Sequence, residues 1–351
     1  MPAGRPALTS AAGFVYDPLC LEHDAGDHPE SPERLRAIVG LLESSGLLAR
    51  LLPIPARDAT VGDLTLVHAR EHVERVRDMA ASGGRWADPD TWVGPRSYDA
   101  AVRAVGGVLA AVDAVIDGDV RSAFCALRPP GHHATPDRAM GFCLFNQVAV
   151  AAGHLVVRRG LERVAILDFD VHHGNGTQDA FYRRGDVLYV STHQYPFYPG
   201  TGHYRETGEG PGEGATVNLP LPRGARDGDI RRVVEEVAAP VVRRFRPQFV
   251  LVSAGYDAHY ADPLAGLELS VDGYGWLMAT AKALADELCD GRLVCVLEGG
   301  YHLTALPWGV RRTIETLLGV EPAPDPLGPL SPDTRFDLSE LVATYRETHG
   351  L

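Results

Sequence analysis

The sequence places two aspartates and a histidine at alternate positions after an apolar run. Asp168, Asp170 and His172 follow Val-Ala-Ile-Leu, and residues two apart on an extended chain face the same side. Carboxylates packed beneath a buried strand repel one another unless a cation compensates them or one is protonated. Two carboxylates and one imidazole around zinc leave a position open for water. We therefore expect Asp170 and His172 to hold zinc, with Asp257 as the second carboxylate; the alternative is that these acids cap helices or pair with arginines.

A histidine pair and a tyrosine suggest proton transfer beside this site. His132 and His133 follow Pro-Pro-Gly, and imidazole titrates near neutral pH, so the pair could carry protons. Asp168 and Asn175 are available to fix their tautomers. Tyr301 follows two glycines and could donate a hydrogen bond to a developing oxyanion, although alone it would more simply be a packed tyrosine.

All these residues follow apolar runs typical of buried parallel strands. Ligands of open parallel sheets bind beyond the carboxyl ends of the strands, so the residues are expected to meet there. The predicted strands are 121–127, 163–168, 187–192, 249–253 and 293–297. The predicted helices are 32–48, 69–81, 97–116, 147–159, 229–245, 271–288 and 306–317. This alternation predicts an α/β fold with a single central, mostly parallel sheet and helices on both faces.

The remaining stretches predict loops and a single domain. Residues 83–95 and 195–214 read as long loops, and loops of this length are usually functional or disordered. Residues 322–334 are proline-rich and read as irregular. We expect one domain over 1–351, with a core of about 14–320 and an extension, 321–351, that packs on it.

Composition narrows the class of protein. Apolar residues make up 45% of the chain, enough for a large core, yet no apolar stretch is long enough to span a membrane. The N-terminal residues lack the apolar segment of a secretory signal, which favours a cytoplasmic protein. The net charge of −13 argues against nucleic-acid partners. The five scattered cysteines argue against disulfides and a thiolate zinc cluster.

Taken together, the motifs resemble the zinc-dependent histone deacetylase family, which has the arginase–deacetylase fold. They occur in the family's order along the chain and comprise HPESPERL (28–35), RPPGHHA (128–134), GFCLFNQ (141–147), LDFDVHHGNGTQ (167–178), YPGTG (198–202), SAGYDAH (253–259), DPLAG (262–266) and LEGGY (297–301).

The resemblance implies a role for each matching residue. Zinc would be bound by Asp170, His172 and Asp257. His133 would be the general base and acid, with His132 as its electrostatic partner. Asp168 would orient His132, and Tyr301 would polarise the scissile carbonyl. Phe142 and Tyr198 would line a tunnel, and Gly141 would accept a hydrogen bond from the substrate amide. Arg34 would line a channel for the released acetate.

The family also binds potassium, which implies one or two such ions here. The first site would use Asp168, Asp170, His172, Ser191 and Thr192, largely through main-chain carbonyls. The second would use the carbonyls of Phe181, Arg184, Val187 and Ala215; the simpler reading of that set is an ordinary loop.

Asn175 stands where class I members have aspartate, and LEGGY replaces a three-glycine version. Both features resemble the class II branch and the bacterial histone-deacetylase-like and acetylpolyamine branch. Tyr301 is present where some members have a histidine that weakens acetyl hydrolysis. The resemblance therefore implies an active enzyme that removes acetyl or another short acyl group from lysine side chains of a peptide or protein. The oligomeric state stays open, a homo-oligomer included.

The nearest rival is hydrolysis of acetylated polyamines. Acidic residues in the two long loops could hold a distant ammonium group: Asp88, Asp90, Glu206 and Glu209. Leu264 argues mildly against it, because the family's eukaryotic polyamine-specific member has glutamate there. Less favoured are a non-catalytic acyl-lysine binder and a two-manganese ureohydrolase, which would need more metal ligands.

Overall fold

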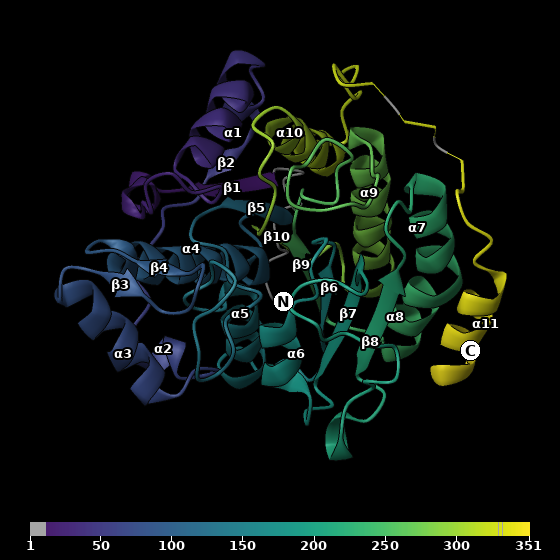
Figure 1. Cartoon of the computed structure of the whole chain (residues 1–351), viewed down its shortest axis with the longest axis horizontal. Coiled ribbons are helices and arrows are strands. Elements are labelled where there is room, and N and C mark those ends of the chain that lie inside the picture. The colour runs from purple at the N-terminus through teal and green to yellow at the C-terminus, as the bar shows by residue number, and fades with distance from the viewer. Residues whose placement is uncertain (1–11, 329, 332) are drawn as a thin grey trace, which may run out of the picture.

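The computed structural model describes residues 12–328, 330–331 and 333–351, and a parallel eight-stranded sheet lies at its centre (Figure 1). The strand order is β2-β1-β5-β10-β9-β6-β7-β8, and every neighbouring pair is parallel. The strands are β1 (Ala12–Tyr16), β2 (Leu52–Pro53), β5 (Ser122–Ala126), β6 (Val164–Asp168), β7 (Val187–Gln194), β8 (Thr216–Leu221), β9 (Phe249–Ala254) and β10 (Leu293–Leu297). The predicted α/β class with a parallel sheet is confirmed, and the five predicted strands match β5, β6, β7, β9 and β10 to within two residues.

Helices cover the sheet on two sides (Figure 1). α4 and α5 pack together on one side, while α9 and α10 pack together on the other, with α1 against α10. The helices are η1 (Pro18–Glu22), α1 (Glu33–Ser44), η2 (Leu48–Arg50), α2 (Val61–Leu64), α3 (Arg70–Ala81), α4 (Ser97–Asp117), α5 (Gln147–Val157), α6 (Asn175–Phe181), η3 (Gly210–Gly212), α7 (Asp227–Val233), η4 (Val234–Ala238), α8 (Ala239–Phe245), α9 (Val271–Leu288), α10 (Ala305–Leu318) and α11 (Ser339–Thr348).

Three departures from the predicted elements have local causes. The helix predicted over 229–245 is divided by the π-helical turn η4. Pro240 follows this turn, lacks an N–H, and cannot continue the regular ladder. β8 contains Pro220 and was not predicted, but proline is tolerated at the edge of a sheet, where β8 lies. The predicted loop 83–95 carries a short hairpin, β3 (Arg85–Trp86) and β4 (Trp92–Val93).

The C-terminal residues run back to the sheet edge. Tyr345 on α11 is buried and donates a hydrogen bond from Oη to the Pro220 carbonyl, 2.5 Å away. Residues 1–11, 329 and 332 lie outside the described residues, so a single domain over 1–351 stays a prediction.

The strand register aligns the carboxyl ends of the strands that precede the candidate site residues. Asp168, the last residue of β6, is paired with Ser191 on β7 and Ser253 on β9. Leu297, the last residue of β10, is paired with Ala254. The segments that follow β6, β9 and β10 therefore leave the sheet side by side.

Candidate metal centre and acid–base site

Asp170, His172 and Asp257 meet beyond the ends of β6 and β9. Their nearest ligand atoms all lie within 4.8 Å of one another. His172 Nδ1 lies 3.0 Å from Asp170 Oδ1 and 3.3 Å from Asp257 Oδ2. Both carboxylates are buried. The structure thus brings together the three residues predicted to bind zinc.

The environment of these ligands fits a divalent cation. Within the described chain, Asp257 Oδ2 is buried and makes no well-aligned hydrogen bond, and the contact of 3.3 Å to His172 Nδ1 is an ion-pair contact only if that ring is protonated. A Cβ at Gly299 would lie 2.0 Å from that oxygen, so only glycine leaves it room. Burial raises the pKa of Asp257, and the Asp170 carboxylate raises it further. A bound cation would relieve this repulsion and satisfy the orphaned oxygen, and two oxygens with one imidazole nitrogen suit catalytic zinc.

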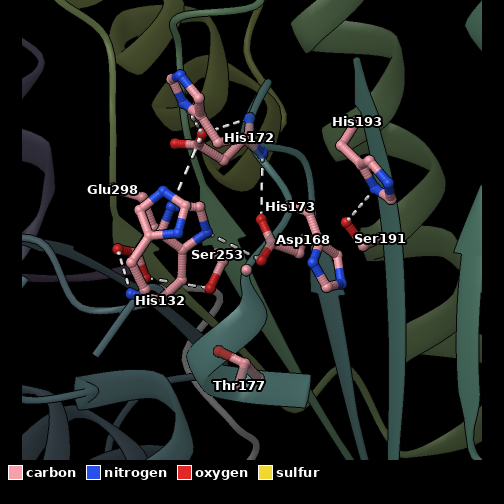
Figure 2. Close-up of polar contacts among 12 residues, drawn as sticks. His132, Asp168, His172, His173, Thr177, Ser191, His193, Ser253 and Glu298 are labelled. Atoms are coloured by element: carbon pink, nitrogen blue, oxygen red, sulfur yellow. Dashed lines mark hydrogen bonds and ion pairs between the residues drawn. The ribbon is translucent and has the colours of Figure 1, made fainter. Parts of the chain in front are cut away.

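Asp168 directs one carboxylate oxygen toward His132 and accepts a hydrogen bond with the other from the backbone N–H of Asp170 at 3.2 Å (Figure 2). Asp168 Oδ2 lies 3.1 Å from His132 Nδ1 and accepts a hydrogen bond from Tyr189 Oη at 3.0 Å. Burial lowers the pKa of His132, but the Asp170 and Asp168 carboxylates outweigh burial and raise it to about 10. The two carboxylates thus favour the charged form of the His132 ring.

His133 has a different environment. Its Nδ1 lies 2.8 Å from Asn175 Oδ1, and its ring packs 4.0 Å from the His132 ring between centroids. Burial holds the pKa of His133 well below its ordinary value, and His132 and His172 lower it further. The pKa values of the two adjacent imidazoles are thus shifted in opposite directions, and the ring with the lowered pKa stays neutral and can act as a base.

Glu298, at the end of β10, was not singled out from the sequence and holds the turn that carries both histidines (Figure 2). Its Oε2 accepts hydrogen bonds from the backbone N–H groups of Gly131 at 2.7 Å and His132 at 3.1 Å. Its Oε1 accepts one from Ser253 Oγ at 3.1 Å. Burial raises the pKa of Glu298 to about 7. The sequence feature that could have identified Glu298 is an acidic residue directly after the apolar run 293–297.

Tyr301 lies beside Arg34. The Arg34 guanidinium carbon sits 5.0 Å from the centre of the Tyr301 ring, and Arg34 donates to the Gly300 carbonyl at 2.7 Å and to Glu30 at 3.0 Å. Arg34 is fully buried. Burial raises the pKa of the Tyr301 phenol well above its ordinary value, so the hydroxyl stays protonated and can donate.

Aromatic rings surround the histidines. Tyr198 packs edge-on against His133 at 5.1 Å and His172 at 6.0 Å, and Phe142 packs edge-on against Tyr301 at 5.8 Å. A Cβ at Gly141 would lie 2.5 Å from the His133 ring.

Leu264 and Asp90 lie on loops next to this group. Leu264 donates to Asp262, which also accepts from the N–H of Tyr301. The Asp90 and Asp88 carboxylates raise the pKa of Tyr198, after the larger effect of burial.

Two of the four acids considered for cation binding are engaged elsewhere. Glu206 accepts hydrogen bonds from Gln178 and from the N–H groups of Gly202 and His203. Glu209 pairs with Arg183 on the surface. Asp88 and Asp90 are the two whose carboxylates raise the pKa of Tyr198.

The residues expected around potassium form two groups, one at the carboxyl end of β6 and on β7, the other at the end of α6 and the starts of β7 and β8. Ser191 and Thr192 follow one another on β7 beside Asp168. In the second set, the Phe181 carbonyl accepts from Arg184 N–H at 2.9 Å and the Ala215 carbonyl accepts from Tyr189 N–H at 2.9 Å. Potassium binding stays a prediction.

Two observations concern the molecule outside this site. A cavity of about 570 Å³ lies at the amino ends of β5 and β10, next to Arg121 and Arg292, at the opposite end of the strands from the carboxylate cluster. No helix in the described part of the chain is long and apolar enough to cross a bilayer.

Comparison with known proteins gives one consistent result. Residues 28–317 match the family described as the histone deacetylase domain. A probable deacetylase of Archaeoglobus fulgidus is 42% identical, over 88% of this chain and 87% of its own. A histone deacetylase-like amidohydrolase of Pseudomonas aeruginosa is 41% identical, over 91% and 90%. A crystal structure of the HDA15 HD domain superposes with a TM-score of 0.88 at 36% identity, over 97% of this chain and 95% of that one.

Proposed function

The chain belongs to the histone deacetylase family and has the arginase–deacetylase fold, and from this premise we propose that it is a zinc-dependent amidohydrolase acting on acylated lysine side chains. The observation that carries the proposal is the cluster of Asp170, His172 and Asp257, in which Asp257 Oδ2 is buried, makes no hydrogen bond and lies 3.3 Å from His172 Nδ1. A zinc ion held there would act as a Lewis acid toward the acyl oxygen and lower the pKa of a bound water.

The protein's own groups would move the protons. His133 has Nδ1 occupied by Asn175, so its Nε2 is free to take a proton from the attacking water. The water oxygen bonds to the acyl carbon, the C–N bond breaks, and His133 returns the proton to the leaving amine. Tyr301 donates a hydrogen bond to the carbonyl oxygen as negative charge develops on it. The products are a carboxylate and a free amine.

The residues around the histidines would bind the substrate chain. We assign the walls to Phe142 and Tyr198, the amide acceptor to Gly141, and rim contacts to Asp90 and Leu264. Arg34, buried beneath Tyr301, would accompany the released acid. We retain the two potassium sites as proposals, in which ordered carbonyls near Ser191 and Phe181 stabilise the loops around the ligands. A cytoplasmic location is likewise proposed.

An acetylated polyamine is the second candidate substrate, and Asp88 and Asp90 support it because their carboxylates are close enough to raise the pKa of Tyr198. The experiment is a kinetic comparison of zinc-loaded enzyme on an acetyl-lysine peptide and on acetylated spermidine and putrescine. We expect the peptide to have the higher kcat/KM. A higher value for the polyamines would reverse the substrate assignment, and no turnover of any acylated amine would reject the proposed function.

A further inference from the structure

We propose that Thr91 is a positioning residue that holds Phe142 in a strained conformation and thereby fixes one wall of the substrate site. The inference rests on the proposed function for the role of that wall. It begins with the turn Met140–Cys143, which is closed by reciprocal backbone hydrogen bonds of 3.1 and 3.0 Å.

Both central residues of this turn have positive φ, 56° at Gly141 and 68° at Phe142. This is the pattern of a type I′ turn, which favours asparagine and glycine. Glycine adopts it freely, whereas a residue with a Cβ and a bulky ring is strained there. Such strain persists only where the surroundings hold it.

Thr91, which is distant from Phe142 in the sequence, restrains the backbone of Phe142 with its side chain. Its Oγ1 accepts a hydrogen bond from the Phe142 N–H at 3.0 Å and donates to Asp90 Oδ1 at 3.1 Å. The side chain is fully buried, and the Ala87 N–H bonds the Thr91 carbonyl at 2.8 Å across the β3–β4 hairpin. Asp90 therefore directs the hydroxyl hydrogen toward itself and leaves an oxygen lone pair for Phe142.

The ring of Phe142 contacts Tyr301, so the restraint on Phe142 affects the site. It packs edge-on against Tyr301 at 5.8 Å and against His28 at 4.6 Å. Gly141, the preceding residue, lies against the His133 ring. A shift of Phe142 N would therefore move the wall between the proposed oxyanion donor and the proposed base. Thr91 touches neither, and acts through Phe142.

The test compares Thr91→Val, which keeps the shape and removes the hydroxyl, with Thr91→Ser, which restores it. Thr135→Val is the matched control, because Thr135 is also buried and also donates to a nearby carboxylate, that of Asp137. Hydrogen exchange is followed on fragments covering 139–144, and KM and kcat are measured on the acetyl-lysine peptide.

In Thr91→Val we expect the Phe142 amide to exchange about tenfold faster, since a lost hydrogen bond is worth about that factor, with exchange in β6 and β10 unchanged. KM should rise about fivefold with kcat within about twofold, the pattern for lost binding. Thr91→Ser and Thr135→Val should both resemble the wild type.

Unchanged exchange at Phe142, an unchanged KM, or equal effects in Thr135→Val would each overturn the proposal. If the wild type turns over no acylated amine, the proposed function fails, and the substrate-wall role proposed for Thr91 falls with it. The exchange measurement would then still decide whether Thr91 holds Phe142.

Discussion

The Asn175 side chain fixes which nitrogen of His133 carries a proton. Asn175 Oδ1 lies 2.8 Å from His133 Nδ1, while Asn175 Nδ2 donates to the His133 carbonyl at 3.4 Å. With the amide oriented in this way, its oxygen can only accept, so Nδ1 holds the hydrogen and Nε2 is left as a base.

Asn175→Asp should shift the activity profile toward higher pH. A carboxylate in place of the amide favours the charged imidazole and raises the pKa of His133. Because the free base is the active form, the acid limb of kcat/KM against pH should move up by about one unit. A limb that stayed in place would mean that His133 is not the base.

Tyr301→Phe should separate catalysis from folding. Tyr301 Oη makes no hydrogen bond to the part of the chain that the structure describes, so the free energy of unfolding should change by less than about 1 kcal/mol. Loss of an oxyanion donor should lower kcat by roughly 10²–10³-fold. Zinc content is the control and should match the wild type. Wild-type turnover in this variant would remove Tyr301 from the mechanism.

Glu298→Ala should destabilise the protein and weaken catalysis together. It leaves three buried donors without an acceptor, from Gly131, His132 and Ser253, and each such loss costs about 1–3 kcal/mol. Glu298→Gln offers one oxygen to the two N–H groups and should cost less than about 1.5 kcal/mol. Urea unfolding and kcat/KM measure both. Equal losses in the two variants would show that the charge, not the acceptor, matters.

His68 should contribute a pH-dependent part of the stability. Its Nδ1 lies 3.0 Å from the Thr135 carbonyl and its Nε2 accepts from Asn146 N–H at 2.9 Å, an arrangement that only the neutral ring can make. Burial lowers its pKa from 6.5 to about 3. The contribution is therefore complete above pH 6.5 and is lost as the pH falls toward 3, because only the unfolded state takes up the proton.

The measurement is urea unfolding at about pH 7 and about pH 5, where the linkage gives a loss of about 2 kcal/mol from His68. His68→Gln does not titrate and should show a smaller difference between the two pH values by that amount. An identical difference in both proteins would mean that His68 is protonated in the folded state.

The sequence was sufficient for the central strands and for the grouping of Asp170, His172 and Asp257, and insufficient where distant segments decide the outcome. β6 is an apolar run that ends in Asp168 and β9 is one that is followed by Asp257, so their identity and direction follow from local pattern. β8 carries Pro220, and only its place at the sheet edge makes it a strand. Likewise Glu206 looks like any loop acid until its oxygens are found bonded to Gln178 and Gly202.

Thr91 and Glu298 illustrate the same limit at the site. Thr91 belongs to no motif, and Glu298 belongs to LEGGY (297–301), but the role of neither follows from its neighbours in the sequence, because each accepts backbone hydrogen bonds from residues far away in the chain. Such roles depend on which turn lies opposite, and local sequence does not specify that.

The bond from Tyr345 to the Pro220 carbonyl has a consequence for self-association. A sheet can extend only at its edges, by adding a strand from another molecule. The β2 edge is two residues long, whereas β8 offers six. Pro220 removes one donor from that edge and Tyr345 occupies an acceptor. The final helix therefore helps to keep the sheet from recruiting a ninth strand from a neighbouring copy.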